Sequence, residues 1–172
     1  MYTYQDAVDA SKKALDQIKE LFFEISKRII EKDLNDYHNN QITLKKINEH
    51  FYLLNDKIEI YSGDGLLTID DRRNTAFRRV FSLEFDNTLQ LSDTVFEGER
   101  YVNKIEYMTM TEFESNKVEV ENVINKMEQS IRVLSDGTVE TWNYRYVSVD
   151  PDVEIDCLES VFEYVISNPY LR

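Results

Sequence analysis

The first apolar pattern along the chain has the spacing of an amphipathic helix. From Gln5 to Asp33 apolar residues follow a spacing that alternates between three and four positions, interrupted once by Ser11; they are Val8, Leu15, Ile18, Phe22, Ile25 and Ile29. This spacing places them on one face of a helix. Ala7, Ala14 and Leu21 widen the stripe, which favours packing on a sheet over a narrow coiled-coil seam. The alternative is that part of this apolar stripe contacts a second copy of the chain in a homodimer.

A turn and a second helix are predicted next. The polar stretch NDYHNNQ, residues 35–41, is typical of a turn. Thr43 is a candidate N-cap, and four apolar residues up to position 55 share a helical face: Leu44, Ile47, Phe51 and Leu54. Residues 1–56 are therefore predicted to be the helical part of the chain.

Alternating patterns then predict strands over most of residues 57–149. Lys57–Tyr61 and Leu66–Asp70 flank SGDG, which predicts a hairpin because glycine permits positive φ. Further strands are predicted for residues 80–86, 88–96 and 99–113, and a helix for residues 115–129. A second hairpin is predicted over residues 130–149, with its turn at Ser135, Asp136 and Gly137.

The chain is predicted to end in a helix over residues 150–168. Asp150 is its candidate cap and Pro151 its first residue, and early carboxylates complement the helix dipole. Hairpin connections imply an antiparallel sheet with helices on one face. We therefore predict a single α+β domain over residues 1–172, with the sheet packed by a long N-terminal helix, a second helix and a C-terminal helix.

The charge of the chain indicates which kind of partner it would bind. The chain has 33 Asp and Glu against 20 Lys and Arg, a net charge of −13. Residues 1–79 hold 14 acids and 13 bases, whereas residues 80–172 hold 19 acids and 7 bases. Between residues 150 and 163 the chain has six carboxylates and no base: Asp150, Asp152, Glu154, Asp156, Glu159 and Glu163. Such a surface repels nucleic acid and anionic membrane and attracts cationic partners.

No catalytic motif is found. Phosphate-binding glycine loops, H-E-x-x-H and G-x-S-x-G are all absent. The two histidines, His38 and His50, and the single Cys157 are too scattered in sequence to suggest a zinc site. We therefore predict no catalytic residue, metal or cofactor. Cys157 is expected to be partly buried in the last helix and inert.

The sequence also indicates a location for the protein. A lone cysteine agrees with a reducing compartment. The chain lacks a bilayer-spanning apolar stretch, and its N-terminus does not have the order of a signal peptide. We expect the protein in the bacterial cytosol.

Two further clusters allow alternative interpretations. Trp142, Tyr144 and Tyr146 project to one face of a predicted strand, which favours core packing, with an interface patch as the alternative. Residues 70–79, DDRRNTAFRR, contain four arginines: Arg72, Arg73, Arg78 and Arg79. They either balance nearby acids such as Asp70, Asp71 and Glu84, or clamp phosphate or a partner's carboxylates.

The sequence favours a non-enzymatic acidic binding protein. We expect it to imitate the charge of a nucleic-acid backbone and block the basic groove of a nuclease or Cas effector, as phage anti-CRISPR and anti-restriction inhibitors do, with no direct contact to nucleic acid or membrane. The expected contact residues are Asp93, Glu97, Glu99, Glu112 and Glu114, with Arg72, Arg73, Arg78 and Arg79 as secondary contacts.

Two alternatives remain. An immunity protein against a nuclease toxin would have the same charge profile. A small enzyme or ligand binder would use a pocket between the sheet and the long helix, with an arginine of residues 72–79 holding an anionic substrate.

Overall fold

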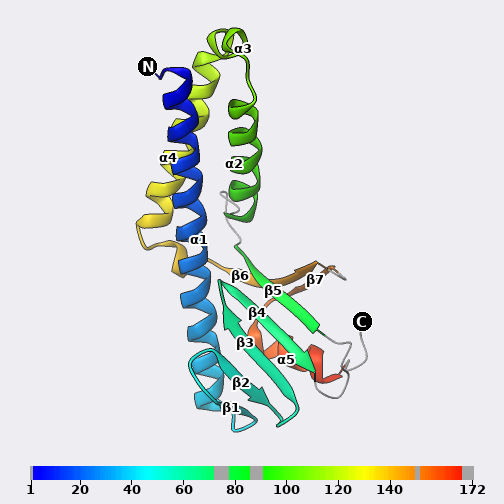
Figure 1. The fold of residues 1–172 in the computed structure, drawn as a ribbon. Coiled ribbons are helices and arrows are strands. Elements are labelled where there is room, and N and C mark those ends of the chain that lie inside the picture. The colour runs from blue at the N-terminus through cyan, green and yellow to red at the C-terminus, as the bar shows by residue number, and fades with distance from the viewer. Residues whose placement is uncertain (1, 72–77, 86–90, 150–151, 168–172) are drawn as a thin grey trace. The chain divides into compact units, whose positions relative to one another are not determined.

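The computed structural model describes residues 2–71, 78–85, 91–149 and 152–167 of the chain. The elements follow one another in the order shown in Figure 1: α1 (Tyr4–Asn40), β1 (Leu44–Lys46), β2 (Phe51–Leu54), β3 (Ile58–Gly63), β4 (Leu66–Asp71), β5 (Arg78–Phe85), α2 (Leu91–Glu106), α3 (Met110–Ser115), α4 (Lys117–Ser135), the short 3₁₀ helix η1 (Val139–Thr141), β6 (Tyr144–Val149), β7 (Asp152–Ile155) and α5 (Leu158–Ser167).

The chain divides into two compact units. Unit 1 comprises residues 1–22 and 87–142, and unit 2 comprises residues 23–86 and 143–172. Helix α1 contributes its first part to unit 1 and the rest to unit 2. That the whole chain forms one domain therefore stays a prediction.

Unit 2 contains one antiparallel sheet. Its seven strands are arranged in chain order from β1 to β7, so that every strand pairs with its neighbour in sequence. The pairs include Leu54 with Ile58 and Leu83 with Tyr146. The predicted α+β class with an antiparallel sheet built from hairpins is confirmed, as are the long N-terminal helix and a C-terminal helix.

The β3–β4 hairpin shows how local sequence determines the sheet. Asp64 and Gly65 have φ values of 54° and 73°, the left-handed conformation that the SGDG turn was expected to adopt. Along β4 and β5, buried residues alternate with more exposed ones. This period of two turns one face of the sheet toward the core.

The second part of α1 and α5 cover that face in unit 2 (Figure 1). Tyr37 of α1 meets Phe162 of α5 edge to face, with ring centroids 4.8 Å apart. The buried residues here are Ile25, Ile29, Ile30 and Leu34 of α1, Leu158, Val161, Phe162 and Val165 of α5, and Tyr52, Ile60, Leu67, Ile69, Phe81, Leu83, Phe85 and Tyr146 of the strands. The predicted stripe on the first helix is therefore core in this part.

Unit 1 is a bundle formed by the first part of α1 with α2, α3 and α4 (Figure 1). Its core includes Ala7, Val8, Ile105, Phe113, Val120 and Ile124. Gly98 lets α2 approach its neighbours, because a Cβ there would lie 2.9 Å from Leu15 Cδ1 and 3.6 Å from Met127 Cε.

The predicted turn at residues 35–41 and helix at residues 43–55 are wrong. Helix α1 continues to Asn40 because Leu34 is fully buried and Tyr37 packs on α5. Residues 44–54 form β1 and β2 instead, since the run FYLL alternates in burial and Asn55 and Asp56 turn the chain with positive φ. Residues 1–56 are thus not wholly helical.

The strands predicted over residues 88–96 and 99–113 are also wrong. The described part of this stretch forms α2 and α3. The positions that face the core are Gly98, Val102 and Ile105, separated by four and three residues, which is a helical period. The helix predicted for residues 115–129 is confirmed as α4, but it continues to Ser135 because Leu134 extends its buried face.

The second hairpin and the start of the last helix need correction as well. Residues 130–135 belong to α4 and do not form a strand. β6 therefore pairs with β5 and β7, and the predicted second hairpin is wrong. Residues 152–155 form β7, in which Val153 and Ile155 alternate with exposed acids, and α5 starts only at Leu158. The predicted cap Asp150 and Pro151 lie outside the described residues.

None of the helices in the described residues is long and apolar enough to cross a membrane.

The hairpin turn gives a test of the fold. Gly65→Ala should destabilise the protein by roughly 1–2 kcal/mol, because alanine is disfavoured at positive φ, and its Cβ would also lie 3.2 Å from the Phe23 carbonyl oxygen. Gly63→Ala is the matched control in the same hairpin, since its Cβ would meet nothing within 4 Å. Urea unfolding followed by circular dichroism measures both. An equal loss of stability in the two variants would contradict the turn geometry.

Candidate functional site

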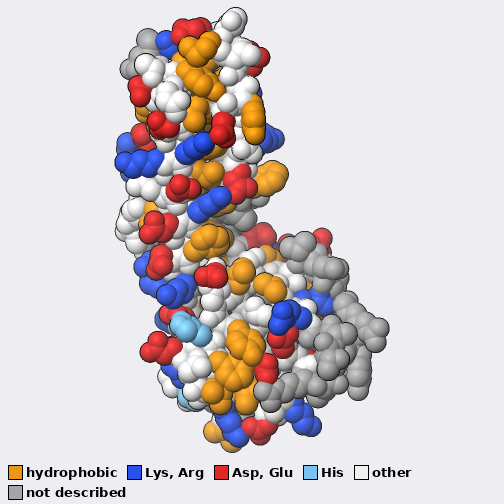
Figure 2. Space-filling view, viewed as in Figure 1, with side chains coloured by type: hydrophobic (Ala, Val, Ile, Leu, Met, Phe, Trp, Pro, Cys, Tyr) orange, Lys and Arg blue, Asp and Glu red, His pale blue; other side chains and the backbone are white. Residues whose placement is uncertain are grey.

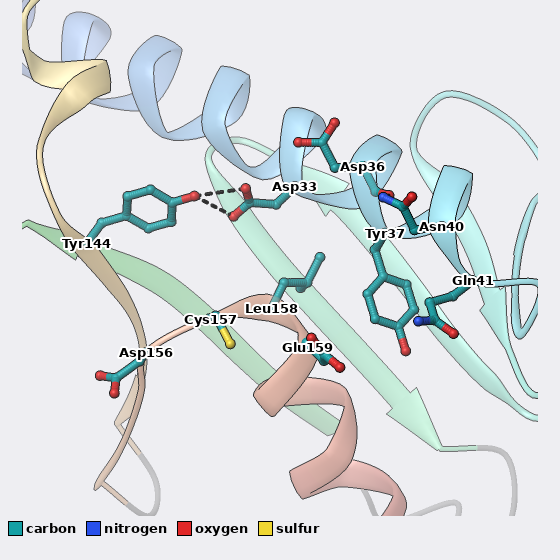
Figure 3. Close-up of a pocket in the computed structure, with 10 residues that line it drawn as sticks. All are labelled: Asp33, Asp36, Tyr37, Asn40, Gln41, Tyr144, Asp156, Cys157, Leu158 and Glu159. Carbon is teal, nitrogen blue, oxygen red and sulfur yellow. Dashed lines mark hydrogen bonds between the residues drawn. The ribbon is translucent and has the colours of Figure 1, made fainter.

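A pocket in unit 2 is the candidate functional site in the described part of the chain. It lies where the end of α1, the start of β6 and the start of α5 meet, and has a volume of about 300 Å³. Its lining consists of Asp33, Asp36, Tyr37, Asn40, Gln41, Tyr144, Asp156, Cys157, Leu158 and Glu159 (Figure 3). Four of these ten residues are carboxylates and none is Lys or Arg.

Asp33 is fixed in this site by two tyrosines. The Tyr144 hydroxyl donates to both carboxylate oxygens, at 2.8 Å to Oδ1 and 2.7 Å to Oδ2. The Tyr146 hydroxyl donates to Oδ2 at 2.6 Å. Short hydrogen bonds to a carboxylate are among the stronger ones in proteins. They connect α1 to β6 and hold the Asp33 carboxylate in one orientation.

The same contacts shift the two tyrosines. Burial, reinforced by the hydrogen bonds to Asp33 and by its negative charge, raises the pKa of Tyr144 above its ordinary value. Burial likewise raises the pKa of Tyr146, with the charge of Asp33 as the next cause. Both hydroxyls therefore stay protonated, and remain donors, throughout the physiological pH range.

The carboxylates of the pocket differ in their partners. Asp36 is paired with Lys32 at 3.0 Å, on the exposed side of α1. Among the described residues, no cationic side chain comes within 4.0 Å of Asp33, Asp156 or Glu159. The pocket therefore carries uncompensated negative charge.

Helix ends explain part of this charge. Asp156 and Glu159 flank the N-terminus of α5, where negative charge is favourable. Asp36 lies near the C-terminus of α1, where the helix dipole disfavours a carboxylate. Helix electrostatics thus account for the acids of α5 but not for those of α1.

Cys157 differs from its prediction. It is exposed rather than partly buried, and it precedes α5 instead of lying inside the helix. The Val161 amide donates to the Cys157 carbonyl at 3.1 Å, and the Cys157 sulfur lies 3.2 Å from the Ser160 hydroxyl. The residue thereby lines the pocket beside the helix start.

The described residues contain no group of three His, Cys, Asp or Glu side chains arranged to hold a metal ion. His38 Nδ1 lies 2.8 Å from the Leu44 carbonyl oxygen, and His50 lies 4.0 Å from Glu31. The two histidines therefore belong to local contacts of unit 2.

The predicted acidic contact residues lie in unit 1. Asp93, Glu97 and Glu99 belong to α2, and Glu112 and Glu114 to α3. The side chain of Asp93 is outside the described part. Glu99 pairs with Lys19 at 2.7 Å and Glu114 with Lys117 at 3.3 Å. Glu97 and Glu112 are exposed, and no described cation lies within 4.0 Å of either.

The predicted arginine contacts fall into two groups. Arg72 and Arg73 lie outside the described residues. Arg78 is exposed and binds Asp70 with two hydrogen bonds, of 2.9 and 3.0 Å. The neighbouring Arg79 is only 3% exposed, on the opposite face of β5. The interpretation in which these arginines balance nearby acids is confirmed for Arg78, and the two arginines do not point to one common site.

Of the predicted aromatic row, Tyr144 and Tyr146 lie on β6, whereas Trp142 precedes the strand. Tyr146 is fully buried, whereas Trp142 and Tyr144 are half-buried, and the Tyr144 and Tyr146 rings meet edge to face. Core packing is confirmed for Tyr146. Sequence reasoning missed Asp33 as a partner of these tyrosines. The one signal in the sequence was that Asp33 follows Ile29 of the apolar stripe by four positions.

Comparisons with protein-family models, curated proteins and solved structures found no match to this chain.

The tyrosine pair predicts an alkaline limit to stability. An unfolded tyrosine ionises near pH 10, whereas the pKa values of folded Tyr144 and Tyr146 are raised. Their contribution to stability is therefore complete below about pH 10 and is lost as the pH rises through the folded pKa. Urea unfolding between pH 8 and 11.5 should show this loss, and it should shrink in Tyr144→Phe and Tyr146→Phe.

The exposed Tyr107 supplies the control, because it is 82% exposed. Tyr107→Phe should leave the alkaline loss of stability unchanged. Tyrosinate absorbance should show that Tyr144 and Tyr146 ionise only as the protein unfolds. Their ionisation at the pH of free tyrosine in the folded protein would contradict the Asp33 geometry.

Proposed function

We propose that this protein is an acidic binding protein of the bacterial cytosol that docks on the basic nucleic-acid-binding groove of a nuclease or Cas effector and blocks it. It would thereby act as an anti-CRISPR or anti-restriction inhibitor of the kind encoded by phages. The observation that carries the proposal is the exposed acidic segment of β7 and α5, which continues into the carboxylate-lined pocket.

The acidic segment is defined as Asp152, Glu154, Asp156, Glu159 and Glu163, all exposed. Its one described cationic neighbour is Arg145, whose Nη1 lies 3.4 Å from Glu154 Oε2. Acids at alternate positions of a strand recur about every 6.7 Å on one side of it. β7 holds two such acids, Asp152 and Glu154, and the other acids of the segment continue the charge beyond the strand. A series of negative charges is the property of a nucleic-acid backbone that a basic groove recognises.

Unit 1 supports the proposal in a weaker way. It contains 15 acids and 8 bases, a net charge of −7. On the face shown in Figure 2, however, acidic and basic side chains are interleaved along this unit. Glu97 and Glu112 are its best remaining contacts, because lysines already neutralise Glu99 and Glu114.

The same surface would suit an immunity protein that neutralises a cationic nuclease toxin. The two functions share the mode of binding and differ in the partner. The ligand-binding alternative placed a pocket between the sheet and the long helix. The pocket of unit 2 is lined mainly by α1 and the start of α5, with Tyr144 as its strand residue, and its charge is opposite to what an anionic substrate requires. This observation favours cationic partners over that alternative.

Charge reversal tests the acidic segment. The double variant Asp152→Lys with Glu163→Lys should weaken binding to the basic partner protein by about tenfold or more, because each charge reversal replaces attraction by repulsion. Neither side chain lines the pocket. Glu97→Lys with Glu112→Lys tests unit 1 in the same way. Asp16→Lys with Glu24→Lys, at exposed positions of α1, is the control with an equal change in net charge.

The partner is captured from bacterial lysate on the immobilised protein and identified by mass spectrometry. The expected partner is a nucleic-acid-processing protein that loses duplex binding as this protein is added, and whose association slows as salt rises. Capture of proteins that still bind duplex normally, or equal weakening by all three double variants, would overturn the proposal.

A further inference from the structure

We propose that the pocket of unit 2 is a receptor for a guanidinium group, bound between Asp33 on α1 and Glu159 on α5. The inference rests on the proposed function in one respect, namely that the expected source of the group is an arginine side chain of the partner. The pocket itself can be tested without the partner.

The charge of the pocket specifies a cation. Its lining combines four carboxylates with the side-chain amides of Asn40 and Gln41, and contains no Lys or Arg. Asp33 and Glu159 project from opposite walls of the pocket, α1 and α5 (Figure 3). A cation that reaches both carboxylates would gain two charge-assisted contacts without displacing any ion pair formed by described residues.

The arrangement of donors and acceptors favours a broad cation. The Tyr144 hydroxyl shares its one proton between Oδ1 and Oδ2 of Asp33, and the Tyr146 hydroxyl donates to Oδ2, so that Oδ1 keeps acceptor capacity for a further donor. Described carboxylates do not converge in a group of three that could surround a metal ion. A planar guanidinium, with five donors that point outward, can span separated acceptors in a way that a compact ammonium cannot.

Aromatic side chains supply the remaining element. Tyr37 and Tyr144 both line the pocket, and a guanidinium packs on the faces of such rings. Tyr37 is held by its contact with Phe162, and Tyr144 by its bonds to Asp33. The two tyrosine rings and Asp33 are thus preorganised, so that on this side of the pocket little ordering is needed on binding. A volume of about 300 Å³ is sufficient for an arginine side chain.

The placement of the α1 acids agrees with this inference. Asp33 and Asp36 lie in the last two turns of α1, toward the negative end of the helix dipole. The C-terminal carbonyls of α1 add partial negative charge at the same end. The N-terminus of α5, on the facing wall, has the opposite sign. The two helix ends therefore offset each other, and the carboxylates supply the attraction for a cation.

Titration of the isolated protein with N-acetyl-arginine amide, followed by amide chemical shifts, tests the pocket. Saturable shifts at the lining residues are expected, with at least about fivefold weaker binding for N-acetyl-lysine amide and none for the neutral citrulline analogue. Asp33→Asn and Glu159→Gln should each weaken arginine binding about fivefold or more. Glu24→Gln, at an exposed position of α1 outside the pocket and the acidic segment, should leave it within twofold.

Asp33 also holds two tyrosines, so Asp33→Asn affects the fold as well as the site. Glu159 is exposed, and its side chain forms no hydrogen bond or ion pair with a described residue. Glu159→Gln therefore changes the site without removing a contact of the fold, and it is the decisive variant. Absence of saturable arginine binding, or equal binding of arginine and citrulline, would overturn the inference. Unchanged affinity in Glu159→Gln would overturn it too.

The source of the guanidinium is decided with the captured partner. If the partner supplies it, Glu159→Gln weakens the complex and excess arginine amide competes with it, which supports both proposals. If arginine amide binds the pocket but no basic protein is captured, the pocket inference holds for a free guanidinium compound and the proposed function fails. If a basic partner is captured but arginine amide does not bind, the proposed function holds and the pocket inference fails.

Discussion

The hydrogen bonds from Tyr144 and Tyr146 to Asp33 are the contacts on which the geometry of unit 2 depends most. They join residues more than 110 positions apart, and they fix α1 against the sixth strand of the sheet. A half-buried carboxylate without a nearby cation is costly unless hydrogen bonds replace its water. The two hydroxyls supply that replacement. The result is a fixed negative charge at the wall of a pocket.

Sequence patterns predicted those elements whose local signals agree with their tertiary environment. The β3–β4 hairpin was predictable because Gly65 marks the turn and the flanking strands alternate. Residues 44–54 were misread because Leu44, Phe51 and Leu54 are spaced like a helix face, whereas Leu44 and Leu54 in fact pair across two strands. Short apolar runs fit both periods, and only strand pairing decides between them.

The candidate site was predictable only in part. A pocket between the sheet and the long helix was one of the alternatives, and its acidic α5 wall is visible in sequence as the run that includes Asp156 and Glu159. The role of Asp33 was not visible, because it depends on two tyrosines brought close by the order of the strands. Side chains distant in sequence meet through topology, which periodicity does not encode.

The acidic side chains of a protein indicate a function only after their ion-pair partners have been identified. In unit 1, Lys12, Lys19, Lys104 and Lys117 each pair with a glutamate, so much of that unit's negative charge is compensated locally. Exposed ion pairs of this kind contribute little to stability, but they remove charge from the long-range field. In unit 2, Asp33, Asp156 and Glu159 lack such partners among the described residues. The unpaired acids of the pocket, rather than the overall acid content of either unit, are therefore the charges on which the proposed cation binding rests.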